Sequence, residues 1–207
     1  VIQLDCRSLK YSYFPLHMED HMIILCDTGV KHNLGDSEYN KRRQQCEEGV
    51  AIISKHIEGV LCLRDLSVEV LAAYKSELTP IVYNRCKYVV EEIARVEEAC
   101  LLLEQGHMKA FGQKMYDTHM GLRDLYEVSC PELDFLVDFT LSSDDVLGAR
   151  MMGGGFGGCT INIVSKDYST TFTTDISEAY KRQFHRSLKT YQTQICNGTG
   201  IVDEDLT

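Results

Sequence analysis

A cluster of glycines near the end of the chain, Gly153-Gly154-Gly155-Phe156-Gly157-Gly158, is the segment best suited to chemistry. Glycine loses more backbone entropy than other residues in a helix or strand, so this segment is predicted to be a loop. Glycine also adopts positive φ, and successive main-chain N–H groups can bind a phosphate. A tight turn that only lets two elements pack has the same composition, so the residues alone leave both interpretations open.

The cluster does not match either of the two common nucleotide-binding loops. A Walker A loop ends in Gly-Lys-Ser or Gly-Lys-Thr, and the cluster has no such ending. A dinucleotide-binding loop lies between a strand and a helix and has an acidic residue downstream, which is not the setting here. If the cluster binds phosphate, it does so in another kind of site.

Tyr39 is a second candidate, because it lies near the start of a predicted helix that follows a polar loop at residues 31–36. A phenol in the first turn can exchange a hydrogen bond with a ligand while its ring packs against a sugar. The alternative is a tyrosine that only packs the helix against a sheet. Arg42 and Arg43 are predicted to be solvated or ion-paired rather than bound to an anionic ligand.

The polar segment at residues 122–134 contains Ser129 and Cys130, either of which is a possible cap for a helix that begins near Pro131. A nucleophilic Cys130 would need a base nearby, and His119 is the candidate along the sequence. We interpret both residues as structural. The histidines and cysteines show no metal-ligand spacing, so no metal site is expected.

The composition is that of an acidic globular protein, with 207 residues, a formal net charge of -10 and 44% apolar residues. An acidic surface repels phosphate backbones, so nucleic acid is not an expected partner. No apolar stretch reaches the roughly 20 residues that span a bilayer, and no signal peptide is present, so we expect no membrane association and a cytoplasmic location. The nine cysteines, among them Cys26, Cys86 and Cys100, are predicted to be reduced, several of them in the core.

The spacing of apolar residues predicts an α+β domain of two layers, one of sheet and one of helices. Strands are expected within residues 1–30, and Ser37 is the predicted N-cap of the first helix. Further helices are predicted over residues 67–78, 80–104 and 108–122, and from Pro131. The third helix is expected to bury Val82, Cys86, Val89, Ile93, Val96 and Cys100.

The end of the chain returns to a mixed pattern. Residues 146–152 lead into the glycine cluster, residues 160–164 alternate as a strand does, residues 176–188 have helical spacing, and residues 190–196 suit a closing strand. This order predicts a split βαβ (ferredoxin-like) element, covered by the middle helices.

Taken together, several segments resemble the galactokinases, which belong to the GHMP superfamily of small-molecule kinases. These are residues 5–8 (DCRS), 37–48 (SEYNKRRQQCEE), 122–134 (LRDLYEVSCPELD) and 148–159 (GARMMGGGFGGC). The glycine motif alone is typical of the whole superfamily, whereas the other segments narrow the resemblance to galactokinases and close relatives.

The resemblance implies a kinase of two domains with its active site in the cleft between them. In the family, the amino-terminal domain holds a sugar motif, an ATP loop and a catalytic aspartate, none of which is found in this sequence. The chain begins at Val1 without an initiator Met. We therefore expect a carboxy-terminal half that is inactive alone, in which strands of residues 1–30 border the missing domain and residues 31–207 form the GHMP kinase carboxy-terminal domain.

The resemblance also implies the reaction, which is transfer of the γ-phosphoryl group of ATP, with Mg²⁺, to the C1 hydroxyl of D-galactose. Tyr39 matches the family tyrosine that hydrogen-bonds galactose, and Gly153, Gly154, Gly155, Phe156, Gly157 and Gly158 match the loop that borders the substrate and phosphates. No catalytic residue or metal ligand is expected in this chain, because the missing half holds them.

Two residues depart from the family pattern: Met152 stands where many members have threonine, and Gly29 where asparagine is frequent. Three alternatives stay open, namely an N-acetylgalactosamine kinase, a galactokinase-like sensor that binds sugar and ATP without turnover, and a purely structural domain.

Overall fold

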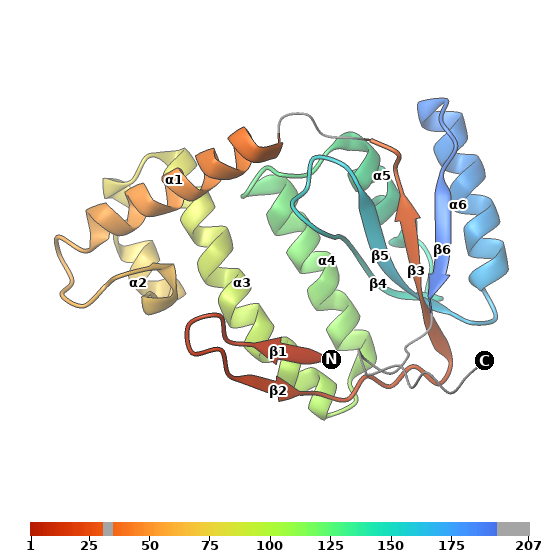
Figure 1. The fold of residues 1–207 in the computed structure, drawn as a ribbon, viewed down its shortest axis with the longest axis horizontal. Coiled ribbons are helices and arrows are strands. Elements are labelled where there is room, and N and C mark those ends of the chain that lie inside the picture. The colour runs from red at the N-terminus through yellow and green to blue at the C-terminus, as the bar shows by residue number, and fades with distance from the viewer. Residues whose placement is uncertain (31–34, 194–207) are drawn as a thin grey trace, which may run out of the picture.

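The computed structural model describes residues 1–30 and 35–193, with side chains from residue 38 onward in the second range (Figure 1). A small hairpin comes first, followed by a strand, a long helical region, two strands, a helix and a last strand. The elements are β1 (Ile2–Leu4), β2 (Tyr11–Tyr13), β3 (His21–Asp27), α1 (Gly35–Ile53), α2 (Val68–Ala73), α3 (Pro80–Glu104), α4 (Met108–Asp124), α5 (Pro131–Thr140), β4 (Val146–Met151), β5 (Cys159–Ser165), α6 (Ser169–Phe184) and β6 (Lys189–Thr193), with short 3-10 turns η1 (Leu63–Asp65) and η2 (Lys75–Glu77).

The main sheet has four strands in the order β4-β5-β3-β6, and every neighbouring pair is antiparallel. Strands β5 and β6 both pair with β3 and are joined by α6, so the predicted split βαβ element is confirmed. Helices α5 and α6 cover one face of the sheet, where their apolar side chains meet those of the strands (Figure 1). This core contains Ile24, Cys26, Leu136, Val146, Val164, Phe172, Ile176 and Tyr180.

Helix α4 packs against the edge strand β4 with almost no space between the two backbones. A Cβ atom on Gly112 would lie 1.9 Å from the Leu147 carbonyl oxygen, and one on Gly148 would lie 2.4 Å from the Gly112 oxygen. Glycine is therefore required on both sides of this contact, which fixes the strand that leads into the glycine cluster.

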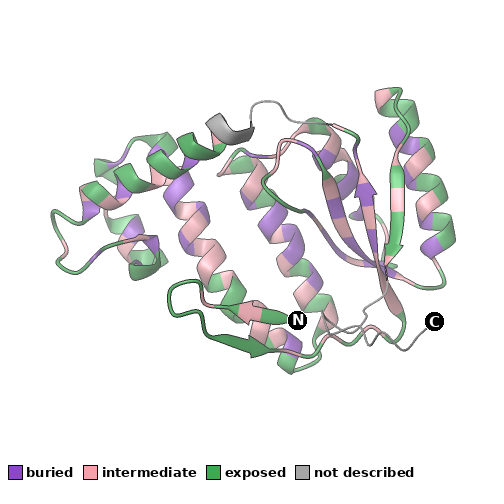
Figure 2. Ribbon diagram, viewed as in Figure 1, coloured by how far each residue is buried: buried purple, intermediate pink, exposed green. Residues whose placement is uncertain are grey.

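A second core lies in the helical part of the molecule, at the end of α3 away from the hairpin (Figure 2). Helices α1, α2 and α3 and the turn η1 enclose it. Its buried members are Ile53, Val60, Leu63, Leu66, Leu71, Leu78, Val82, Cys86 and Val90. The predicted two-layer α+β architecture is confirmed, with this helical region as an extension beside the sheet.

Most predicted elements are present, and α3 spans the predicted residues, with the Thr79 hydroxyl accepting a hydrogen bond from the Val82 N–H. The predicted burial of α3 is partly wrong, because Val96 is exposed while Tyr88 and Val90 are buried. The buried face of α3 changes along its length, because the first half of the helix packs against α1 and the second half lies near α4 and the hairpin.

Three predicted boundaries are wrong. Helix α1 begins at Gly35, so Ser37 lies in its first turn rather than at its N-cap; Asp36 also suits a first turn, where the helix dipole favours a negative charge. Helix α6 covers residues 169–184 rather than 176–188. It begins earlier because Phe172, four residues before Ile176, is buried on the same face, and it ends where His185 takes a left-handed φ of 55°.

Two further predicted elements differ only slightly from those in the structure. The predicted helix at residues 67–78 divides into α2 and the turn η2. The closing strand β6 ends at Thr193, and the remainder of its predicted range, up to Cys196, lies outside the described residues.

The cysteines of the described ranges are all free thiols, with Cys26 and Cys86 buried and Cys100 half-buried. This agrees with the prediction of reduced residues. None of the helices in the described ranges has the length and apolar composition needed to cross a bilayer.

Candidate functional site

The glycine cluster forms the loop between β4 and β5, as predicted. Its backbone takes positive φ at Gly153 (79°), Gly155 (88°), Gly157 (141°) and Gly158 (81°). Phe156 also has a positive φ of 60°, which few residues with side chains adopt. A helix or strand through this segment is therefore excluded, and the glycines are needed for the path of the chain.

One part of this loop packs tightly against the protein. A Cβ atom on Gly155 would lie 2.1 Å from the Val128 carbonyl oxygen, and one on Gly157 would lie 2.6 Å from the Val30 oxygen. The Phe156 N–H donates a hydrogen bond to the same Val128 oxygen at 2.6 Å. At these positions the packing interpretation of the cluster is sufficient.

The other part of the loop is open. A Cβ atom on Gly153, Gly154 or Gly158 would meet no atom within 4 Å. Within residues 1–30 and 35–193, the N–H groups of Gly153 and Gly154 have no hydrogen-bond partner. At Gly154 φ is not positive and a side chain would have room, so packing does not explain the glycine there. A glycine at this position would, however, leave the main-chain donors accessible to a ligand.

Both ends of the loop are fixed by buried polar residues. The Met151 N–H donates to His119 Nδ1 at 3.2 Å, and His119 Nε2 lies 3.2 Å from Asp134 Oδ1. At the other end, the backbone N–H and the hydroxyl of Thr28 both donate to the Gly158 oxygen, at 3.0 and 2.8 Å. The open part of the loop is thus held between two rigid anchors.

Tyr39 lies in the second turn of α1, and 58% of its surface is exposed. This exposure argues against a side chain that only packs the helix against the sheet. Burial raises the pKa of the neighbouring Tyr126 to about 12, and the nearby Cys46 thiol and Tyr39 phenol add to the rise. Tyr126 and Phe156 of the glycine loop both pack against the cluster of Val128, Leu133 and Met151.

Arg42, one turn after Tyr39, joins the start of α1 to the segment at residues 126–128. Its Nε donates to the Tyr126 oxygen at 2.6 Å and its Nη2 to the Glu127 oxygen at 2.8 Å. It also pairs with Glu38, while the exposed Arg43 pairs with Glu47. The prediction of ion-paired arginines is confirmed, although the buried contacts of Arg42 with main-chain carbonyls were not foreseen.

Cys130 occupies the N-cap position of α5, but its side chain makes no capping hydrogen bond. The Ser129 hydroxyl instead donates to Asp134 Oδ1 at 2.5 Å. Burial raises the pKa of the Cys130 thiol, which disfavours a thiolate nucleophile. Because Met151 and Asp134 lie at the two ring nitrogens of His119, the structural interpretation of Cys130 and His119 is supported.

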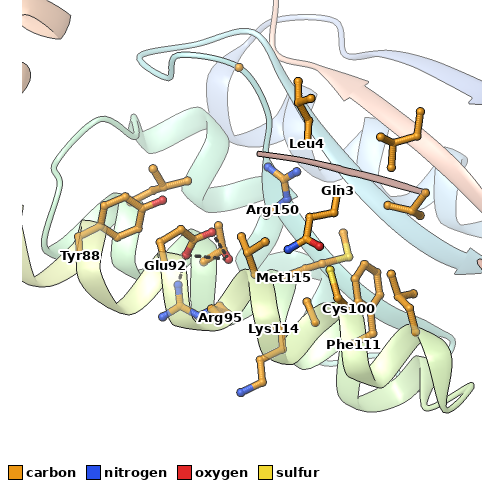
Figure 3. A pocket seen from close by; sticks show the side chains of 18 residues that line it. Gln3, Leu4, Tyr88, Glu92, Arg95, Cys100, Phe111, Lys114, Met115 and Arg150 are labelled. Atoms are coloured by element: carbon orange, nitrogen blue, oxygen red, sulfur yellow. Dashed lines mark hydrogen bonds and ion pairs between the residues drawn. The ribbon is translucent and has the colours of Figure 1, made fainter. Parts of the chain in front are cut away.

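A cavity of about 490 Å³ lies between β1 and the helices α3 and α4 (Figure 3). Gln3 points into it from the hairpin, while Arg150 and Gly153 reach it from the side of the glycine loop. Its wall carries Glu92, which accepts a hydrogen bond from Thr118 and pairs with Arg95. Nowhere in the described ranges do three or more histidine, cysteine, aspartate or glutamate side chains gather as metal ligands would.

The structure brings together three of the four segments singled out in the sequence, namely those of Tyr39, residues 122–134 and the glycine loop. The fourth, residues 5–8, lies at the hairpin tip, where Asp5 and Arg7 pair with Arg64 and Asp65 of η1. It is therefore a structural contact on the helical part of the molecule, away from the glycine loop (Figure 1).

Sequence reasoning missed Thr28 and Arg85. Thr28 is a single hydroxyl after a strand, which carries no distinctive signal. Arg85 did carry a sequence signal. It follows Val82 by three residues and precedes Val89 by four, so it lies on the apolar stripe of α3. A charged residue at a core position of a helix needs buried hydrogen-bond or ion-pair partners. An arginine on an apolar stripe is therefore a candidate for joining two elements of the fold.

Comparison with known proteins agrees with this arrangement. The family described as "GHMP kinases C terminal" matches residues 97–182. Galactokinase from Clostridium beijerinckii is 40% identical over 96% of the chain, and galactokinase from Bos taurus is 38% identical over the same share. Residues 97–182 thus match the GHMP kinase carboxy-terminal domain, and the chain as a whole is similar to galactokinases.

Structural comparison shows the same similarity. Lactococcus lactis galactokinase, in a crystal structure complexed with galactose, matches 94% of the chain with a TM-score of 0.88 and 31% identity. The mevalonate kinase of L. major has a TM-score of 0.54 and 18% identity, which shows a shared fold. The chain spans 48% of the Bos taurus sequence, 51% of the Clostridium sequence and 50% of the Lactococcus chain.

Proposed function

We propose that this GHMP kinase domain is part of a longer enzyme, the parent kinase, which transfers the γ-phosphoryl group of ATP to the C1 hydroxyl of D-galactose. Residues 1–30 would border an amino-terminal domain and residues 31–207 would form the carboxy-terminal one. The catalytic aspartate and most Mg²⁺ ligands would come from the amino-terminal domain, and the kinase would act in the cytoplasm. The similarity to galactokinases over 96% of the chain supports this proposal.

The observation that carries the proposal is that the start of α1, which bears Tyr39, and the glycine loop both contact the segment at residues 126–128. Tyr39 is an exposed phenol on α1, and the N–H groups of Gly153 and Gly154 have no partner among the described residues. A phenol suits a sugar, and converging N–H groups suit an anion. A sugar kinase needs both kinds of contact, close together, in one cleft.

The open part of the loop fits a phosphate group. Gly153 and Gly154 leave space where side chains would stand, and their N–H groups are available there. ATP, with Mg²⁺, supplies the phosphoryl group when bound. The loop would hold charge that grows on phosphate oxygens, which is a large part of phosphoryl-transfer catalysis. Met152, half exposed at the root of the loop, supplies no hydroxyl there, so the main chain would make these contacts.

The substitution at Gly29 is compatible with this site. Gly29 has a φ of 68°, and its N–H donates to Asp27 Oδ1 at 2.9 Å. Asparagine is among the residues that enter this left-handed region most readily. The family's asparagine and the glycine here would therefore give the same turn after β3.

The test is the change Tyr39→Phe in the parent kinase, with kinetics measured by ADP release. Removing a hydroxyl that binds the sugar should raise KM for galactose about fivefold, since one such hydrogen bond is worth roughly 1 kcal/mol. KM for ATP should stay unchanged. Tyr83→Phe, a half-buried tyrosine of α3 beside Lys75, serves as the matched control. An unchanged KM for galactose would remove Tyr39 from the sugar site.

The chain by itself should show no turnover with galactose and MgATP, because it holds one wall of the site. Turnover at a rate typical of a full enzyme would place the catalytic groups inside this chain. N-Acetylgalactosamine is the alternative acceptor, and the ratio of kcat/KM for the two sugars decides between them. A non-catalytic sensor would bind both ligands, by calorimetry, without releasing ADP, and a structural domain would bind neither.

A further inference from the structure

Two buried arginines converge on the short segment at residues 125–127. Arg42 is 5% exposed and Arg85 is 3% exposed. Arg42 donates to the carbonyls of Tyr126 and Glu127, and Arg85 donates to the carbonyl of Leu125. The N–H groups of Leu125 and Tyr126 bond to the Gly121 oxygen of α4, so α4 holds N–H groups of this segment while the two arginines hold its carbonyls.

The arginines also connect the segment to the helices. Arg42 belongs to α1 and pairs with Glu38 of the same helix, while Arg85 belongs to α3 and donates to Gln45 of α1 at 3.3 Å. Arg85 further pairs with the Glu127 carboxylate at 2.6 Å and holds the pKa of that carboxyl below its usual range. Each guanidinium thus makes several directed contacts, which a lysine ammonium would not reproduce in the same geometry.

The segment has a strained backbone at its centre. Glu127 takes a φ of 52°, in the left-handed region that residues with a side chain seldom adopt. Such conformations persist where surrounding contacts over-determine them. Arg42 on the carbonyl of Glu127 and Arg85 on its carboxylate provide those contacts.

Val128, the next residue, contacts the glycine loop directly. The Val128 oxygen accepts the Phe156 N–H at 2.6 Å and leaves no room for a side chain at Gly155. Phe156 itself has a positive φ, so two strained residues flank the contact. The position of the loop therefore depends on the same backbone that the arginines hold.

We propose that Arg42 and Arg85 are positioning residues that hold the glycine loop in place relative to Tyr39, acting through the carbonyls of residues 125–128. The part of the inference that concerns catalysis rests on the proposed function, since it assigns the loop to phosphate and Tyr39 to sugar. Neither arginine is required to touch a ligand. Phosphoryl transfer needs its reacting groups in a precise geometry, so a small shift of the loop would lower kcat.

The first test uses hydrogen exchange of the chain as it stands, comparing Arg42→Lys with the matched control Arg43→Lys. Arg43 is adjacent in sequence, but its side chain is exposed and pairs only with Glu47. Arg42→Lys should speed exchange of the Phe156 amide about tenfold, because local opening of the loop costs less. Exchange in β5 should not change, and Arg43→Lys should behave as the original chain does. Arg85→Lys should repeat the effect.

Glu127→Gln provides a milder variant in case an arginine change unfolds the chain. It keeps the backbone contacts of Arg42 and removes only the charge on the partner of Arg85, so exchange of Phe156 should rise about threefold. Unchanged exchange of Phe156 in all three variants would overturn the inference. Faster exchange spread evenly over the loop and β5 would do the same, since it reports general destabilisation.

Kinetics of the parent kinase separate this inference from the proposed function. Arg42→Lys should lower kcat about tenfold or more, with a smaller change in KM for galactose than Tyr39→Phe produces. A lower kcat with unchanged exchange of Phe156 would overturn positioning through the loop. A parent protein without any galactose phosphorylation, in which the variants still loosen the loop, would refute the proposed function and leave the positioning role standing.

Discussion

The hairpin β1–β2 and the four-stranded sheet are both antiparallel, but they are stabilised by different forces. The sheet buries one face under α5 and α6, with Phe172 and Tyr180 completely enclosed. The hairpin exposes Ile2, Leu4 and Tyr13, which share one face because Ile2 pairs with Tyr13 and Leu4 with Tyr11 (Figure 2). The sheet is thus complete within this chain, whereas a two-stranded hairpin without a covered face is marginal in water.

Charged groups attach the hairpin instead of an apolar core. Arg7 pairs with Asp65 at 3.1 Å, and Arg64 pairs with Asp5 at 2.5 Å, so each side of the contact gives one cation and one anion. The two arginines are about half exposed and the two aspartates less so, and ion pairs that water can reach contribute little and are screened by salt. We therefore expect the stability of the hairpin and that of the four-stranded sheet to respond differently to loss of an aromatic ring, to acid and to surface substitution.

The largest effect should come from removing an aromatic ring in the sheet core. Phe172→Ala should lower the free energy of unfolding by about 3–5 kcal/mol, because it leaves a cavity under a completely buried side chain. The matched change in the hairpin is Tyr13→Ala, at a residue that is 72% exposed. It should cost less than about 0.5 kcal/mol. Urea unfolding measures both, and equal losses would contradict the comparison.

An intermediate effect should appear in acid. Main-chain N–H groups of Leu61 and Cys62, together with Arg7, lower the pKa of Asp65 from 3.8 to about 2. A lowered pKa in the folded protein stabilises the contact above the usual value, and this stabilisation is lost as the pH falls from about 4 toward 2. Amide protection in β1 and β2 should therefore disappear before protection in β5.

Asp65→Asn is the control for this acid transition. The amide does not titrate, so hairpin protection in the variant should be weaker at neutral pH and should lose most of its pH dependence. Exchange measured by NMR, corrected for intrinsic rates, would separate the two strand pairs. Simultaneous loss of protection in both regions would show that the hairpin is not an independent unit.

The smallest effect on stability should come from polar substitution on the hairpin face. Ile2→Ser together with Leu4→Ser should change the free energy of unfolding by less than about 0.5 kcal/mol. The exposed apolar patch should nevertheless bind less dye and promote less self-association, since such patches favour contacts with other surfaces. Sedimentation velocity and dye fluorescence measure this, and an unchanged sedimentation coefficient with unchanged dye binding would argue that the face is not an adhesive surface.

The sequence by itself determined most elements of the fold. The apolar period and Pro80 placed α3 over residues 80–104. Glycine composition required a loop at residues 153–158, and the order of strands and helices indicated the split βαβ element. These features follow from neighbours along the chain, so local propensity and periodicity are sufficient to predict them.

Only the tertiary structure decided how the candidate site is assembled. The contacts of Arg42 with residues 126 and 127, of Thr28 with Gly158, and of Val128 with Phe156 join segments that lie 28 to 130 positions apart. Periodicity carries no information about such distances. Two strained residues, Glu127 and Phe156, also ran against local preference and depend on those distant contacts. The chain therefore specifies its elements locally, while polar contacts between elements bring the start of α1 and the glycine loop to the segment at residues 126–128.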